Sequence, residues 1–135
     1  MSEITIPFHL VIPTIIGIVA LVIIFLKRKI LLNDQKRKYF WISIAIFFAV
    51  YIIIVGGATI SDLYCQWDLN RYDLDKDGIF SGAELSEEQD AAMSRLTNDI
   101  GRNFSFVIGL IFSAFISIPI YIFGNLYEQS SKQIS

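Results

Sequence analysis

The chain has 135 residues, of which 54% are hydrophobic, 14% aromatic and only 18% charged. Soluble domains carry about 25% charged residues, so this composition indicates a membrane protein. The net charge of −2 conceals two fields of opposite sign: six of the eleven Lys and Arg residues lie at 27–38, and ten of the thirteen acids lie at 62–99. No polar segment interleaves basic and aromatic residues, which argues against nucleic acid as a partner.

The first predicted element is a transmembrane helix over 4–26. Residues 10–26 contain no charge, and with their flank they are long enough to cross a hydrocarbon core of ~30 Å. A cleaved signal peptide would have Lys or Arg before the apolar run and small residues after it. Here Glu3 precedes the run and three basic residues at 27–29 follow it. The sequence therefore favours a retained span.

A short basic loop follows at 27–38, with six basic residues and one acid. The positive-inside rule places such a loop in the cytoplasm. Its basic side chains would meet anionic headgroups at the bilayer edge, so membrane lipid is an expected partner.

The second predicted transmembrane helix covers 39–60. It opens with the aromatic belt Tyr39-Phe40-Trp41 and is then almost wholly apolar. Neither Pro nor Gly interrupts 58–72, so the helix is expected to continue without a break beyond the membrane.

Residues 73–84 place oxygen-bearing groups at fixed intervals between the second and third spans. Calcium takes six to eight oxygen ligands, and a twelve-residue loop supplies them from positions 1, 3, 5, 7, 9 and 12, with Gly at 6 for a sharp turn. The residues at these positions are, in order, Asp73, Asp75, Asp77, Ile79 through its carbonyl, Ser81 through a water, and Glu84 as a bidentate carboxylate, with Gly78 at the turn.

This loop resembles that of the EF-hand calcium-binding superfamily. The resemblance covers roughly 61–100 and is specific only for 73–84; it implies a helix–loop–helix that binds Ca²⁺ through the six residues above. Phe80 departs from the family pattern, because an aliphatic residue usually stands there in the short pairing strand. EF-hands also generally work in pairs, whereas this chain has one. The missing mate predicts a homo-oligomer or a hetero-complex with another membrane protein.

Two starts are open for the helix after the loop, because both 81–84 and 86–89 have capping-box character. The exit helix begins either at Gly82 or at Glu87. Apolar residues then recur at helical spacing, and this face either packs on the incoming helix or lies on the membrane surface. Its members are Leu85, Ala92, Met93, Leu96 and Ile100.

The third predicted transmembrane helix covers 104–123 and contains no charge. Ser105, Gly109, Ser113 and Ser117 recur every four residues and form one small face. Such faces usually serve helix packing, and we favour that interpretation over a pore lining, since selectivity filters typically carry charged rings or carbonyl arrays.

These elements predict an all-α integral membrane protein with three transmembrane helices and one EF-hand inserted between the second and third. The N-terminus and the EF-hand segment 61–103 would be extracytoplasmic, and the short tail 124–135 cytoplasmic. Since the chain has one His and one Cys, and calcium accounts for its carboxylate cluster, an enzyme is not expected. The leading function is a calcium-responsive accessory or sensor subunit of a membrane complex. A calcium-stapled structural subunit and a calcium-gated homo-oligomeric channel are the alternatives.

Overall fold

The computed structural model describes residues 4–34 and 37–133, and this part of the chain contains helices and no strand. The helices are α1 (Phe8–Leu26), α2 (Arg28–Leu31), α3 (Lys38–Asn70), the 3₁₀ helix η2 (Gly82–Glu84), α4 (Glu87–Thr97), α5 (Ile100–Asn103) and α6 (Ser105–Gln133). The predicted all-α class is confirmed.

Three helical stretches are long and apolar enough to cross a membrane, as predicted. They are α1, α3 and the stretch Glu87–Ser130, whose apolar part is α6. The second of them continues unbroken past the apolar run, because α3 extends to Asn70. Two features were not predicted: the basic loop contains the short helix α2, and α6 continues through the predicted tail as far as Gln133.

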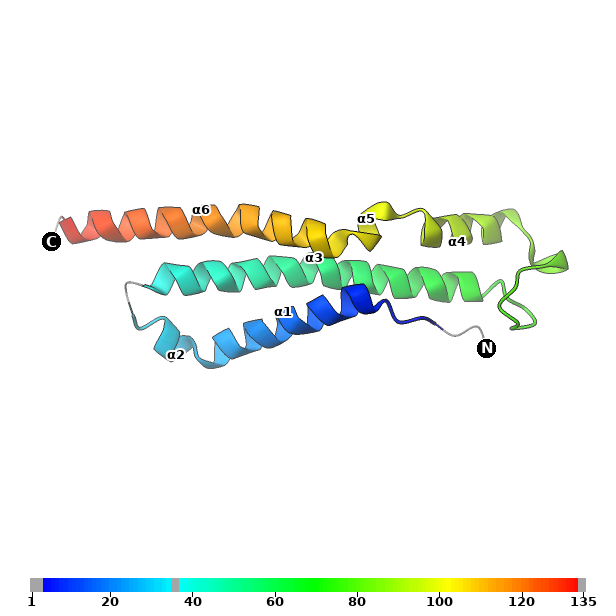
Figure 1. Ribbon diagram of the computed structural model, residues 1–135, viewed down its shortest axis with the longest axis horizontal. Helices are drawn as coiled ribbons and strands as arrows, with labels where there is room; N and C mark the ends of the chain where they lie inside the picture. Colours follow the sequence, from blue (N-terminus) through cyan, green and yellow to red (C-terminus); the bar gives the residue numbers. More distant parts are fainter. Residues whose placement is uncertain (1–3, 35–36, 134–135) are drawn as a thin grey trace.

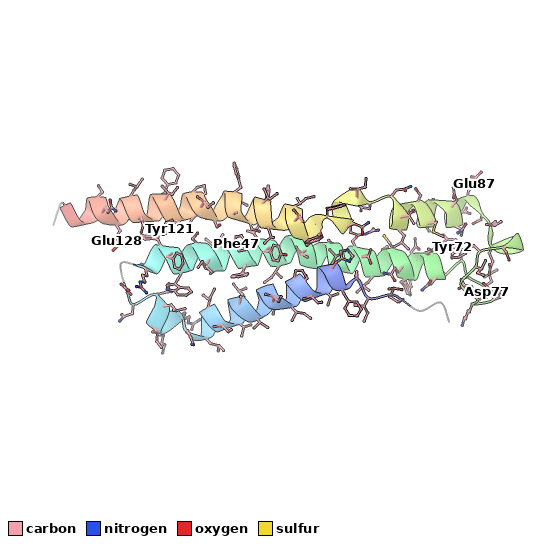
Figure 2. All side chains as sticks on the ribbon, in the orientation of Figure 1. Phe47, Tyr72, Asp77, Glu87, Tyr121 and Glu128 are labelled. Carbon is pink, nitrogen blue, oxygen red and sulfur yellow. The ribbon has the colours of Figure 1, made fainter. Side chains whose placement is uncertain are left out.

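The three long helices lie side by side with α3 in the middle, α1 on one side and α6 on the other (Figure 1). Helices α4 and α5 continue the line of α6 along the far part of α3. The loop between α3 and α4 lies at the same end of the molecule as the N-terminus, while α2 and the C-terminus lie at the other end. Figure 2 shows Asp77 and Glu87 at the loop end and Glu128 near the opposite end.

Glycines allow both outer helices to approach α3 closely. A Cβ on Gly17 of α1 would lie 3.1 Å from an α3 side-chain atom, and one on Gly109 of α6 would lie 3.0 Å from Val55 Cγ2. Small residues at such crossings let apolar helices pack by van der Waals contact, the main attraction available within lipid. The buried cluster of Leu10, Tyr51 and Val55 lies at this level of the molecule.

The small face of α6 packs against α3. Ser113 is completely buried, Ser105 and Ser117 nearly so, and the Ser43 hydroxyl of α3 donates a hydrogen bond of 2.6 Å to the Ser117 carbonyl. The packing interpretation is therefore confirmed, and this face is not available to line a pore. By contrast, Phe115 on α6 is 77% exposed, as expected of a side chain that faces lipid.

Candidate metal centre

The loop after α3 turns back sharply enough to carry α4 along α3 in the opposite direction. Gly78 has a φ of +81° and Gly82 a φ of +56°, and Lys76 also adopts a positive φ, of +62°. Glycine takes this left-handed backbone without steric cost. The structure thus gives Gly78 the turn position that the spacing predicts.

Three of the predicted ligands gather at one point of this loop. Asp73, Asp75 and Glu84 each offer a carboxylate oxygen, and these oxygens all lie within 4.8 Å of one another. Asp73 and Glu84 are only 4% and 7% exposed. Carboxylates this close repel one another unless protons or a cation compensate their charge, so the cluster has the chemistry of a site for a hard cation.

Glu84 is fixed in this cluster by three backbone N–H groups. Its Oε1 accepts hydrogen bonds from Leu74 N at 2.6 Å and Asp75 N at 3.2 Å, and its Oε2 accepts one from Ser81 N at 3.1 Å. The hydrogen bonds from Ser81 and Asp75 contribute most to holding the pKa of Glu84 below its ordinary value, against the opposing effect of desolvation. Glu84 is therefore a carboxylate at neutral pH, as a metal ligand must be.

Asp73 supplies the sharpest indication that the cluster fits a cation. Its Oδ2 accepts a hydrogen bond from Gly78 N at 3.2 Å, while its Oδ1 is buried and has no hydrogen-bond partner within the described ranges. A buried acceptor left without a partner costs roughly 1–3 kcal/mol, and more when it is charged. A cation bound between Asp73, Asp75 and Glu84 would remove that cost.

The remaining predicted ligands lie on the same loop but outside this group. Asp75 Oδ1 accepts from Asp77 N at 3.2 Å, and Asp77 Oδ1 accepts from Ile79 N at 2.7 Å. These local bonds shape the turn. The ligand roles of Asp77, Ile79 and Ser81 stay predictions.

The helix after the loop begins at the second of the two predicted starts. Ser86 caps α4, its Oγ accepting from Gln89 N at 3.1 Å, whereas Gly82–Glu84 forms only the turn η2. Helix α4 packs along α3 with Ala92 buried, so its apolar face lies on the incoming helix. Leu85 and Ile100, which were predicted for that face, are exposed.

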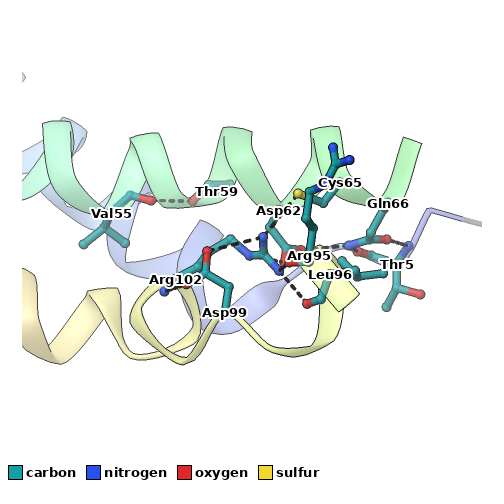
Figure 3. A network of polar contacts seen from close by, with 10 residues as sticks. All are labelled: Thr5, Val55, Thr59, Asp62, Cys65, Gln66, Arg95, Leu96, Asp99 and Arg102. Atoms are coloured by element: carbon teal, nitrogen blue, oxygen red, sulfur yellow. Dashed lines mark hydrogen bonds and ion pairs between the residues drawn. The ribbon is translucent and has the colours of Figure 1, made fainter. Parts of the chain in front are cut away.

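A buried arginine, Arg102 in α5, joins α3 to the segment that precedes α6 (Figure 3). Arg102 and Asp62 are each 6% exposed, and Arg102 Nε lies 3.1 Å from Asp62 Oδ1 as an ion pair. Arg102 Nη1 also lies 3.7 Å from Asp99 Oδ2, and Nη2 donates to the carbonyls of Arg95 and Leu96 at the end of α4. One side chain thus ties together α3, α4 and α5.

The same network includes the segment before α1. Gln66 Nε2 donates to Asp62 Oδ2 at 2.8 Å and to the Thr5 carbonyl at 2.8 Å, while Gln66 Oε1 accepts from Thr5 N at 2.7 Å. Cys65, the single cysteine, is half-buried and accepts a hydrogen bond from Arg102 Nη1 at 3.3 Å. Polar contacts therefore connect the segment before α1, the second half of α3 and α5 at this end of the molecule.

The pairing of Asp62 with Arg102 was not predicted from the sequence. A usable signal was present: Arg102 is the only basic residue between positions 96 and 131, and it lies two residues before the apolar span 104–123. Asp62 lies two residues after the apolar span 39–60. Opposite charges at the same level of two neighbouring antiparallel helices are good candidates for an ion pair.

Comparisons with known protein families, with characterised proteins and with solved structures give no match to this chain.

Proposed function

We propose that this protein is an integral membrane calcium-binding protein that acts as a calcium-responsive accessory or sensor subunit of a membrane complex. The observation that carries the proposal is the cluster of Asp73, Asp75 and Glu84, with one buried Asp73 oxygen unpartnered. The cluster lies between two helices of membrane-spanning length. The EF-hand spacing of the loop makes calcium the expected ion.

The arrangement of the ends supports the proposed orientation. The metal-binding loop and the N-terminus lie at one end of the molecule, and the basic segment 27–38, which contains α2 and joins α1 to α3, lies at the other. With the basic loop in the cytoplasm, the metal centre lies outside, where calcium is abundant enough for sites with dissociation constants of about 10⁻⁴–10⁻³ M.

The polar network provides a route from the loop to the membrane. Arg102 binds the carbonyls of Arg95 and Leu96 at the end of α4 and pairs with Asp62 on α3. A displacement of α4 on calcium binding would therefore be carried to Arg102 and to the start of α6. Sensor EF-hands change the angle of their helices on binding calcium, whereas buffer EF-hands scarcely move.

A calcium-stapled structural subunit is the second candidate. The observation in its favour is that three N–H groups already hold Glu84 and a buried ion pair already fixes α5. In that case calcium would add stability without movement. The homo-oligomeric channel has less support, because the small face of α6 is covered by α3.

The test is a calcium titration of the full purified chain in mild detergent, with amide hydrogen exchange of residues 87–110 as the readout. A sensor changes exchange across α4, α5 and the start of α6, and partners that co-purify change with calcium. A staple binds calcium but changes exchange only within 73–84. Glu84→Gln should weaken binding at least tenfold, whereas Glu88→Gln, an equal charge change on the exposed side of α4, should not. Absence of calcium binding by the wild type would refute both candidates.

A further inference from the structure

At the end of the molecule opposite the loop, α1, α2 and α3 enclose an apolar groove of about 360 Å³. Leu21 and Phe25 of α1 form one wall, Trp41 and Ala45 of α3 form the other, and Leu31 of α2 lies at the end. This volume falls in the range of about 300–1,000 Å³ that is typical of small-molecule sites.

The groove exists because the chain leaves the line of α1 at Lys27. Lys27 has φ −90° and ψ 6°, and its N–H closes the last turn of α1 on the Ile23 carbonyl. Helix α2 then forms a separate short element near the start of α3 (Figure 1). The break separates α2 from α1 and opens the space between them and α3.

Arg28 is the one charged residue among those that line this groove, and the surface that it contributes to the lining is apolar. Its guanidinium carbon lies 4.3 Å from the centroid of the Phe25 ring, and no carboxylate in the described part of the chain forms an ion pair with it. Arginine side chains commonly cover apolar surface with their stem and keep the charged group in a polar layer. The guanidinium is thus available to an anion from outside the protein.

We propose that this groove binds one anionic phospholipid, with an acyl chain along the apolar walls and the headgroup phosphate at Arg28. The apolar groove matches the acyl chain of such a lipid, and the guanidinium of Arg28, which lies over the Phe25 ring beside the groove, matches its phosphate. The surrounding segment 27–38, with its six basic residues, strengthens the preference for a net negative headgroup, because basic residues at a bilayer surface attract anionic lipid. The site is independent of the metal centre and does not rest on the calcium proposal.

The two tryptophans make this proposal testable. Trp41 lines the groove, whereas Trp67 lies near the loop end of α3; in a Trp67→Phe protein, Trp41 is the only tryptophan. Lipids with brominated acyl chains quench tryptophan fluorescence by contact. The Trp67→Phe chain would be reconstituted in phosphatidylcholine bilayers with a small, equal mole fraction of brominated phosphatidylglycerol or brominated phosphatidylcholine. We expect stronger quenching by the anionic lipid, equivalent to a local enrichment of roughly fivefold.

Two variants in the Trp67→Phe background separate the groove from general attraction. Arg28→Gln should abolish the difference between the two lipids, while Lys29→Gln, which removes a neighbouring charge outside the groove, should retain most of it. Circular dichroism checks that both variants keep the helical content of the parent. Equal quenching by both lipids in the parent protein would overturn the proposal. So would an equal loss in the two variants, which indicates diffuse attraction by the basic loop. Protection of Trp41 from both lipids would also overturn it, since a second copy or a partner helix would then occupy the groove.

Discussion

Asp62, on α3, and the cluster of Asp73, Asp75 and Glu84, on the loop after α3, differ in how their negative charge is compensated. Asp62 is buried against the Arg102 guanidinium, a full positive charge 3.1 Å away. Asp73, Asp75 and Glu84 are clustered within 4.8 Å, and the Glu84 carboxylate is held by backbone N–H groups. The N–H dipoles supply only partial charge, and one Asp73 oxygen stays without a partner. The charge of Asp62 is therefore compensated within the chain, whereas the cluster of Asp73, Asp75 and Glu84 has the properties of a site for an external cation.

The largest expected change in stability comes from breaking the buried ion pair of Asp62 with Arg102. Arg102→Leu leaves Asp62 buried and uncompensated, which should lower the free energy of unfolding by roughly 3–5 kcal/mol. The double variant Asp62→Leu with Arg102→Leu should recover most of this loss, since an apolar pair has no charge to desolvate. Denaturant unfolding in detergent, followed by circular dichroism, measures both. If Arg102→Leu cost no more than Arg95→Leu, whose parent side chain is 65% exposed, the pair would not support the fold as described.

The second effect in size is the stabilisation that calcium should give by binding to the cluster of Asp73, Asp75 and Glu84. Calcium at a hundredfold excess over its dissociation constant should stabilise the wild type by about 2.7 kcal/mol. Asp73→Asn should weaken calcium binding at least tenfold, or about 1.4 kcal/mol, because it removes a ligand charge while keeping an acceptor for Gly78 N. Isothermal titration calorimetry gives the affinities. Asp90→Asn, an exposed acid on α4, is the matched control, and an equal loss there would show that only net charge matters.

The two ion pairs of Asp68 should contribute less to stability than the Asp62–Arg102 pair or bound calcium. Asp68 Oδ1 lies 3.6 Å from Arg71 Nη1 and Oδ2 lies 3.7 Å from Arg95 Nη1; the Asp68 side chain is 15% exposed, but both arginine side chains are more than 60% exposed and stay solvated. Asp68→Asn should therefore lower the stability by only about 0.2–1 kcal/mol, and less at high salt because exposed charges are screened. Unfolding at low and high salt checks this. A loss comparable to that of Arg102→Leu would remove the distinction between buried and exposed pairs.

The smallest expected effect is an increase in stability, whereas the substitutions above lower stability or weaken calcium binding. In the metal-free protein, Asp75→Asn should raise the free energy of unfolding by about 0.5 kcal/mol, because it relieves repulsion in the cluster and keeps an oxygen acceptor for Asp77 N. Asp62→Asn should lower it under the same conditions. Thermal unfolding in the presence of a chelator compares the two variants. Destabilisation by both would mean that the cluster is compensated within the chain.

The features that were predictable are those encoded locally. Each span follows from one unbroken apolar run, and the positions of Asp73, Asp75 and Glu84 follow from spacing within twelve residues. The pairing of Asp62 with Arg102 joins residues 40 positions apart, so it depends on how α5 packs against α3. The end of α1 at Leu26 agrees with the predicted end of the first span, but the short helix α2 inside the basic loop was not predicted, since basic residues are compatible with both loop and helix. The helical tail beyond 124 continues α6 without a stop signal strong enough to end it.

The length of α3 fixes how far the metal centre stands from the bilayer. Residues 61–70 extend α3 beyond its apolar part, a distance of ~15 Å at about 1.5 Å per residue. The headgroup layer takes up roughly 5–7 Å of this. The remaining distance is close to the Debye length of ~8 Å at physiological ionic strength. For the calcium site that we propose, we therefore expect the affinity to depend mainly on the carboxylates of the loop and to change little when the anionic lipid content of the membrane changes.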